Sequence, residues 1–372
     1  MPHPCADWAD DALLAAAAEA LRMHDESFSA TLQYIVDTEG SLHDFCFANG
    51  LHRFGLHRAA GGWHFREWAP SALACSLVGE FNEWDSANHP GRADSHGVFH
   101  GFVPDAAGLR PGDRYKLELT VRSRAGTLTR IHCVPAWARC TQQDTHTGEL
   151  YALVPPDDLL AYPWRHPRKI PPPETALRIY EAHVGISSSE PVVADWEHFR
   201  VHVLPRVAAL GYTALLLIAA QEHGYYASLG YQVTSFFAPP SRFGSPSQLQ
   251  ALVDDAHGYG MRVLFEVVHS HASSNVSESL IETYFLPGGD GWHAEWGTRM
   301  FDFGRLEVIR FLLSQLCWYA RRLAEGSPMG SPPHTPPTSY PPRCHRHTPP
   351  TPDPARCHRQ VRRVLPRRRL PL

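Results

Sequence analysis

Residues 65–85 read FREWAPSALACSLVGEFNEWD. Short apolar segments alternate in this stretch with Pro, Gly, Asn and Asp, which favour turns. The same alternation continues on both sides and predicts strands at Trp63–Trp68, Ala74–Val78, Gly97–Val103, Tyr115–Val121 and Thr127–Ile131. Strands this short and this closely spaced are typical of a β-sandwich. Residues 49–155 are therefore predicted to form an all-β sandwich domain.

An N-terminal helical segment is predicted over residues 1–48, before the sandwich. Apolar side chains from Leu13 to Phe28 fall roughly on one stripe, and the run is rich in alanine, which favours helix. The helix is expected over residues 8–38.

A different pattern follows the sandwich. Residues 156–176 are rich in proline and are predicted to be a linker. Over residues 177–325, continuous apolar strands alternate with helices that begin near Asp195, Ser245 and Glu307. The strands are expected at Leu177–Val184, Thr213–Ala219 and Arg262–Val268. This alternation indicates parallel β/α units.

The last 47 residues, 326–372, differ in composition from everything before them. They hold 13 of the 33 prolines, nine arginines and a single acid, Asp353. Such a segment cannot bury a core and is predicted to be disordered. It is either a natural basic tail or the product of a shifted reading frame or retained intron. The second origin is favoured because the composition changes in one step at Gly326.

Bulk composition excludes several classes of function. The net charge of −4 gives no general attraction to nucleic acid or anionic membranes. The eight cysteines are scattered without paired short spacing, as expected of free thiols in a reducing compartment. No basic leader or apolar stretch of about 20 residues occurs, so a cytoplasmic location is expected. His269 and His271 lack a third ligand, and neither a metal nor a cofactor is predicted.

Four segments together resemble the eukaryote-type 1,4-α-glucan branching enzymes of glycogen and starch synthesis, in the α-amylase superfamily. They are residues 65–85, 179–188 (IYEAHVGISS), 223–237 (HGYYASLGYQVTSFF) and 266–273 (EVVHSHAS). The similarity runs from about residue 25 to 323. It implies a multidomain protein with a glucan-binding sandwich and an eight-stranded β/α barrel, of which this chain holds about three strands.

The resemblance also implies where catalysis would occur. Retaining transfer needs two carboxylates about 5–5.5 Å apart, and in this superfamily they follow the fourth and fifth barrel strands, with a third after the seventh. The family's Arg-Phe-Asp-Gly-like motif is replaced here by Glu325-Gly326-Ser327-Pro328. No catalytic residue can be assigned, and the chain is predicted to be truncated and inactive. Glu266, where the family has Asp, is interpreted as a strand-end residue holding neighbouring loops.

Part of a sugar subsite remains by motif match. His271 would donate a hydrogen bond to a sugar hydroxyl, and Tyr231 would stack on the ring, unless it packs in the barrel. Tyr226 and His223 would line the same loop. In the sandwich, Trp84 and Trp68 are either glucan-stacking or core residues, and core is favoured.

The resemblance implies an α-glucan partner, glycogen or starch. Two alternatives stay open: a non-catalytic glucan-binding protein, and a frame-shifted gene product with no stable fold. Loss of the later strands would expose Val263, Leu264, Phe265, Val267 and Val268. The partial barrel is therefore expected to be unstable, with limited proteolysis leaving a fragment near residues 45–155.

Overall fold

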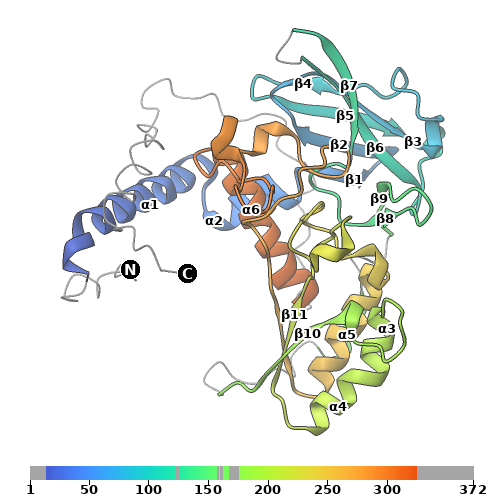
Figure 1. The fold of residues 1–372 in the computed structure, drawn as a ribbon. Helices are drawn as coiled ribbons and strands as arrows, with labels where there is room; N and C mark the ends of the chain where they lie inside the picture. Colours follow the sequence, from blue (N-terminus) through green and yellow to red (C-terminus); the bar gives the residue numbers. More distant parts are fainter. Residues whose placement is uncertain (1–13, 123–125, 157–158, 160–161, 167–175, 325–372) are drawn as a thin grey trace.

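A computed structural model describes residues 14–122, 126–156, 159, 162–166 and 176–324. It contains a two-sheet sandwich, a three-stranded parallel sheet and six α-helices within these ranges. The predicted tail, most of the predicted linker and the first 13 residues lie outside the described residues. Figure 1 shows the sandwich and the parallel sheet on opposite sides of helix α6 (Leu306–Trp318).

The predicted N-terminal helix is confirmed from Ala18 onward, and residues 8–13 of the prediction lie outside the described residues. Helix α1 (Ala18–Glu39) projects from the body of the molecule (Figure 1) and fully buries only Ile35. Gly40, with φ of 89°, ends it. Helix α2 (Leu42–Cys46) follows, capped by Ser41, whose hydroxyl accepts a hydrogen bond from the Asp44 N–H at 3.0 Å.

The sandwich is also confirmed, and all of its described strands pair antiparallel. One sheet has the order β1-β2-β5-β4: Gly55–Ala59, Gly62–Trp68, Val98–Pro104 and Arg92–Ala93. The other has the order β3-β6-β9-β8, with β7 also pairing with β6: Ala72–Gly79, Arg114–Arg122, Leu150–Leu153, Thr141–Gln143 and Leu128–Cys133.

The parallel sheet has the order β10-β11-β12: Ile179–His183, Ala214–Ile218 and Arg262–Phe265. Its helices are α3, α4 and α5: Trp196–His198, Leu204–Ala209 and Pro246–Gly258. A π-helical turn, Phe199–Val203, joins the first two. Asp195 caps α3 and Ser245 caps α5, at the positions where the sequence predicts these helices to begin. Ser245 and Gln248 also form a reciprocal capping pair.

Strand β12 is shorter than predicted and ends at Phe265 instead of Val268. The Glu266 N–H still donates to the Leu217 carbonyl at 3.0 Å. The Val268 N–H, however, donates to the side-chain carbonyl of Gln221 at 2.6 Å. A side chain thus replaces the backbone partner and ends the ladder.

The two faces of the parallel sheet differ in burial. Leu215, Leu217 and Val263 are buried on the face covered by helices. On the other face, Leu216 and Leu264 are half-buried, and the Ile179 side chain is 46% exposed. The sequence predicted that the apolar side chains of the third strand would be exposed. This is wrong for Val263 in β12 and for Val268 just after the strand, because both side chains are buried. Leu264, Phe265 and Val267 are half-buried.

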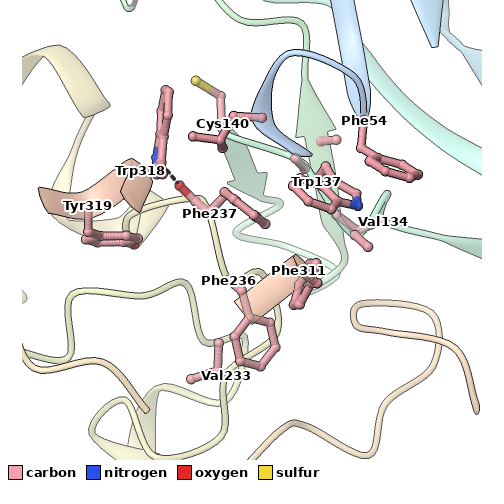
Figure 2. Close-up of a cluster of buried hydrophobic side chains, with 14 of the residues drawn as sticks. Phe54, Val134, Trp137, Cys140, Val233, Phe236, Phe237, Phe311, Trp318 and Tyr319 are labelled. Carbon is pink, nitrogen blue, oxygen red and sulfur yellow. Dashed lines mark hydrogen bonds between the residues drawn. The ribbon is translucent and has the colours of Figure 1, made fainter. Parts of the chain in front are cut away.

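A single core joins the sandwich to the parallel sheet. Trp137, which follows the sandwich strand β7, stacks between Phe54 at 5.0 Å and Phe237 at 4.8 Å, measured between ring centroids. Phe311 of α6 meets the Trp137 ring edge-on at 5.4 Å. Figure 2 shows this cluster, in which the Trp318 indole N–H donates to the Phe237 carbonyl at 2.9 Å.

Candidate functional site

Two loops meet beyond the carboxyl ends of β11 and β12. The Val233 N–H donates to the His271 carbonyl at 3.2 Å, and the Ser273 N–H donates to the Val233 carbonyl at 2.8 Å. These bonds place the segment that carries Tyr231 beside the segment that carries His271. Ligand sites in parallel β/α folds form at this edge of the sheet.

Tyr231 reaches back to the end of β12. Its hydroxyl donates to the two carboxylate oxygens of Glu266 at 3.3 and 3.4 Å. Burial, and then the Glu266 charge, raise the pKa of Tyr231, so the hydroxyl keeps its proton at neutral pH. The ring is still 46% exposed and therefore available for a stacking contact.

His271 is held by a second set of contacts. Its Nδ1 lies 2.9 Å from the Thr298 hydroxyl. The Trp296 ring meets the imidazole edge-on at 4.6 Å, and His293 stacks on Trp296 at 4.4 Å with only 10° between the planes. Burial, and then the nearby His293, lower the pKa of His271, which favours a neutral imidazole at pH 7.

Trp296 is a residue of this site that sequence reasoning missed. Its side chain is 58% exposed, yet the stack with His293 fixes its orientation. An exposed aromatic ring held in a fixed orientation can stack on the apolar face of a ligand ring. The available signal was two tryptophans in the glycine-rich stretch GGDGWHAEWG, residues 288–297.

His223 and Tyr226 belong to the same loop as Tyr231 but occupy a different place. Their rings stack on each other with centroids 5.9 Å apart. The His223 ring also meets Phe243 edge-on at 6.0 Å, and the Tyr226 ring meets His183 edge-on at 6.3 Å. His223 Nδ1 lies 2.9 Å from the Gln221 carbonyl oxygen and donates to it. His223 Nε2, the Tyr226 hydroxyl and both ring nitrogens of His183 are buried and make no hydrogen bond in the described structure.

Glu222 organises this loop, and the sequence did not single it out. Its buried carboxylate accepts hydrogen bonds from the Thr141 hydroxyl at 2.8 Å, the Ser241 N–H at 2.8 Å and the His223 N–H at 3.0 Å. Because Thr141 lies on strand β8, this carboxylate ties the loop to the sandwich.

Trp84 lies on the sandwich, separate from these loops. It is half-buried, in contrast to the expectation of a core residue, because the turn after β3 places residues 83 and 84 at positive φ. Tyr151 meets its ring at 5.6 Å and His132 lies 6.5 Å away. Trp68 does lie in the core, edge-on to Tyr284 at 5.2 Å.

The remaining histidine of the pair, His269, has a packing role. Its Nε2 lies 2.8 Å from the Gln315 side-chain oxygen on α6. Within the described residues, no group of three His, Cys, Asp or Glu side chains is arranged to hold a metal. In that same part of the chain, no helix has the length and apolar character needed to cross a bilayer.

Known proteins resemble both the sandwich and the chain as a whole. Residues 53–138 match carbohydrate-binding module 48, described as the isoamylase N-terminal domain. Two solved structures share the fold over 73% of this chain. They are a putative α-amylase from Salmonella typhimurium (TM-score 0.56, 22% identity, 42% of that chain) and a pullulanase from Paenibacillus barengoltzii (TM-score 0.58, 18% identity, 46% of that chain). At these identities the likeness concerns the fold alone.

Sequence relatives are closer. The 1,4-alpha-glucan-branching enzyme of Rhizophagus irregularis is 41% identical over 310 residues, which cover 81% of this chain and 44% of that protein. The Aspergillus oryzae enzyme is 42% identical, covering 80% and 44%, and the Equus caballus enzyme is 39% identical, covering 78% and 42%. The chain thus spans less than half the length of these relatives. The resemblance is confirmed: this protein is a relative of the 1,4-alpha-glucan-branching enzymes and corresponds to an N-terminal portion of them.

Proposed function

We propose that this 372-residue chain binds α-glucan at two places and does not itself catalyse branching. The observation that carries the proposal is the combination of a carbohydrate-binding module match with a half-exposed tryptophan on the sandwich and two exposed aromatic side chains, Tyr231 and Trp296, beyond the parallel sheet. The flat apolar face of a pyranose suits such rings.

On the sandwich, Trp84 would stack on a glucose residue. Its half-exposed ring stands beside Tyr151, whose hydroxyl donates to Glu149 at 2.7 Å. Glu149 also accepts from the Lys116 ammonium at 2.6 Å. The neighbouring charged groups are thus paired with one another and offer polar atoms at the rim of the ring.

Beyond the parallel sheet, Tyr231 would stack on a second glucose and His271 would donate to one of its hydroxyls. Trp296 extends this surface, because its ring touches His271. His223 and Tyr226 supply further polar groups from the same loop. This proposal divides the chain into a sandwich over residues 49–155 and a partial barrel over residues 177–325.

Inactivity follows from the carboxylates. Double displacement needs one carboxylate as nucleophile and a second as acid and base. Near the carboxyl ends of the described parallel strands, Glu266 is hydrogen-bonded by Tyr231. Glu222 is buried, and its carboxylate accepts three hydrogen bonds. The proposal assigns both carboxylates a structural role, because each accepts hydrogen bonds from neighbouring protein groups.

Co-sedimentation with glycogen tests the proposal. Trp84→Ala and the double variant Tyr231→Ala/His271→Ala should each lower the bound fraction several-fold, by removing about 1 to 2 kcal/mol of contact at their own site. Phe28→Ala is the matched control, since Phe28 is 58% exposed on α1, away from both sites. Binding that is absent in the unaltered chain, or unchanged in both variants, would contradict the proposal.

A second candidate is an active branching enzyme whose later strands are encoded in another reading frame. It is favoured by the abrupt change of composition at Gly326, directly after an amphipathic helix. The nucleotide sequence after codon 325 decides between the two. An Arg-Phe-Asp-Gly-like segment in another frame would establish the second candidate.

A further inference from the structure

Helix α6 presents one continuous stripe of side chains to α2. Residues 310, 314 and 317 of α6 follow one another at helical spacing and so lie along one side, and residue 321 continues the stripe in the π-helical segment Tyr319–Ala324. The Arg310 guanidinium donates to the Phe45 carbonyl at 3.2 Å, and the Ser314 hydroxyl donates to the Cys46 carbonyl at 3.0 Å.

The far end of the stripe is fixed as well. The Arg321 guanidinium lies 4.7 Å from the centroid of the Phe47 ring. Cys317 lies between Ser314 and Arg321 on this stripe, and these two contacts place it beside Cys46 on α2. Figure 1 shows α2 and α6 side by side at this point.

The two thiols differ in reactivity. Cys317 is partly exposed, and the neighbouring Cys46 thiol, with a smaller contribution from Arg321, lowers its pKa to about 7. Cys46 is 3% exposed, and its pKa is raised by the neighbouring Cys317 thiol and then by burial. A partly exposed thiolate beside a second thiol is the arrangement that thiol–disulfide exchange requires.

We propose that Cys46 and Cys317 are a thiol modification site, which reacts with a small disulfide such as glutathione disulfide and closes to an internal disulfide. The Cys317 thiolate attacks one glutathione sulfur, forms a mixed disulfide and releases one glutathione thiolate. Cys46 then gives its proton to solvent, and its sulfur attacks the Cys317 sulfur and releases the second glutathione. Two protein thiols are oxidised and one glutathione disulfide is reduced to two thiols.

The bridge would fasten the N-terminal helices to α6. The linked positions are far apart in the sequence, and a crosslink that closes a long loop restricts the unfolded chain most strongly. Among the other cysteines that the structure describes, Cys75, Cys133 and Cys140 are at most 3% exposed, so they compete poorly for the reagent. This inference does not depend on glucan binding.

Peptide mapping by mass spectrometry tests it on the full chain, after incubation of reduced protein with glutathione disulfide. The expected product is a peptide pair joined through Cys46 and Cys317, with a thermal midpoint several degrees higher that dithiothreitol reverses. Cys46→Ser should instead leave glutathione on Cys317. Recovery of Cys46 as a free thiol while Cys317 carries glutathione, in the unaltered chain, would overturn the inference.

A register control separates this pair from general thiol reactivity. In the double variant Cys317→Ser/Leu316→Cys, the thiol moves one position along α6 to a site that is 39% exposed. It should acquire glutathione without joining Cys46. A bridge from position 316 that forms as readily as from 317 would show that the stripe has no special geometry, and would also overturn the inference.

Discussion

At the scale of single residues, Glu67 is the most unusual group. It belongs to the E-W-A-P motif of residues 67–70 and is only 4% exposed. Its carboxyl group accepts from the Ala136 N–H at 3.1 Å and from the Tyr284 hydroxyl at 3.4 Å. Burial raises its pKa to about 8. The folded protein therefore holds Glu67 protonated through neutral pH.

This burial predicts a pH dependence of stability. Below pH about 4.5, Glu67 is protonated in both states and contributes no slope. Between pH about 4.5 and 8 only the unfolded chain releases the proton. As the pH rises through this range, the free energy of unfolding should therefore fall by up to about 1.4 kcal/mol per pH unit. Glu67→Gln should remove this component of the slope. Urea unfolding from pH 5 to 8 measures it, and equal slopes in both proteins would contradict the assignment.

Individual residues of the site were only partly predictable. Tyr231 and His271 were predicted from their match to the family's motifs, and backbone hydrogen bonds place their two segments side by side. Glu222 and Trp296 were missed because their roles depend on partners distant in sequence, Thr141 and His271. The exposure of Trp84 could not be predicted either. It follows from the positive φ angles of residues 83 and 84, and neither residue is a glycine that would have indicated such a turn.

At the scale of elements, α1 is attached to α6 by one buried ion pair. Arg310 is fully buried, and its guanidinium lies 2.8 Å from Glu39 and 2.9 Å from Glu307. Removing Glu39 leaves part of that charge uncompensated. Glu39→Ala should lower the free energy of unfolding by about 3 kcal/mol. Chemical denaturation measures this change.

A matched control lies on the same helix. Glu26 pairs with Arg22 at the exposed surface of α1, where an ion pair contributes little. Glu26→Ala should leave stability nearly unchanged. Equal effects of the two substitutions would mean that the Glu39–Arg310 contact does not hold α1 in place.

Most elements could be predicted because they carry local signals. The caps Asp195 and Ser245 and the alternating apolar segments located helices and long strands. Strands β1, β4, β8 and β9 were not predicted, because they are short or polar and owe their conformation to neighbours in the sheet. The early end of β12 could not be predicted either, because it depends on the Gln221 side chain, which accepts the hydrogen bond of the Val268 N–H.

At the scale of the whole molecule, the shared core changes the expected unfolding behaviour. Sequence alone suggested a sandwich that survives without the partial barrel. Trp137, however, is 3% exposed between Phe54, Phe237 and Phe311, which come from both units. The sandwich and the parallel sheet should therefore unfold in one transition.

Trp137→Ala tests this coupling. The substitution should cost about 3–5 kcal/mol and shift the unfolding of both units together. Limited proteolysis of the variant should then degrade residues 45–155 along with the parallel sheet. A protected fragment over 45–155, with an unchanged sandwich transition, would show that the two units fold separately.

The central claim, glucan binding without branching, is tested most directly by incubating the purified chain with amylose and recording the proton NMR spectrum of the polymer. We predict that the chain is retained on the polymer while no anomeric signal of α-1,6 linkages appears. An α-1,6 signal that grows with time and with the amount of this chain would contradict the claim.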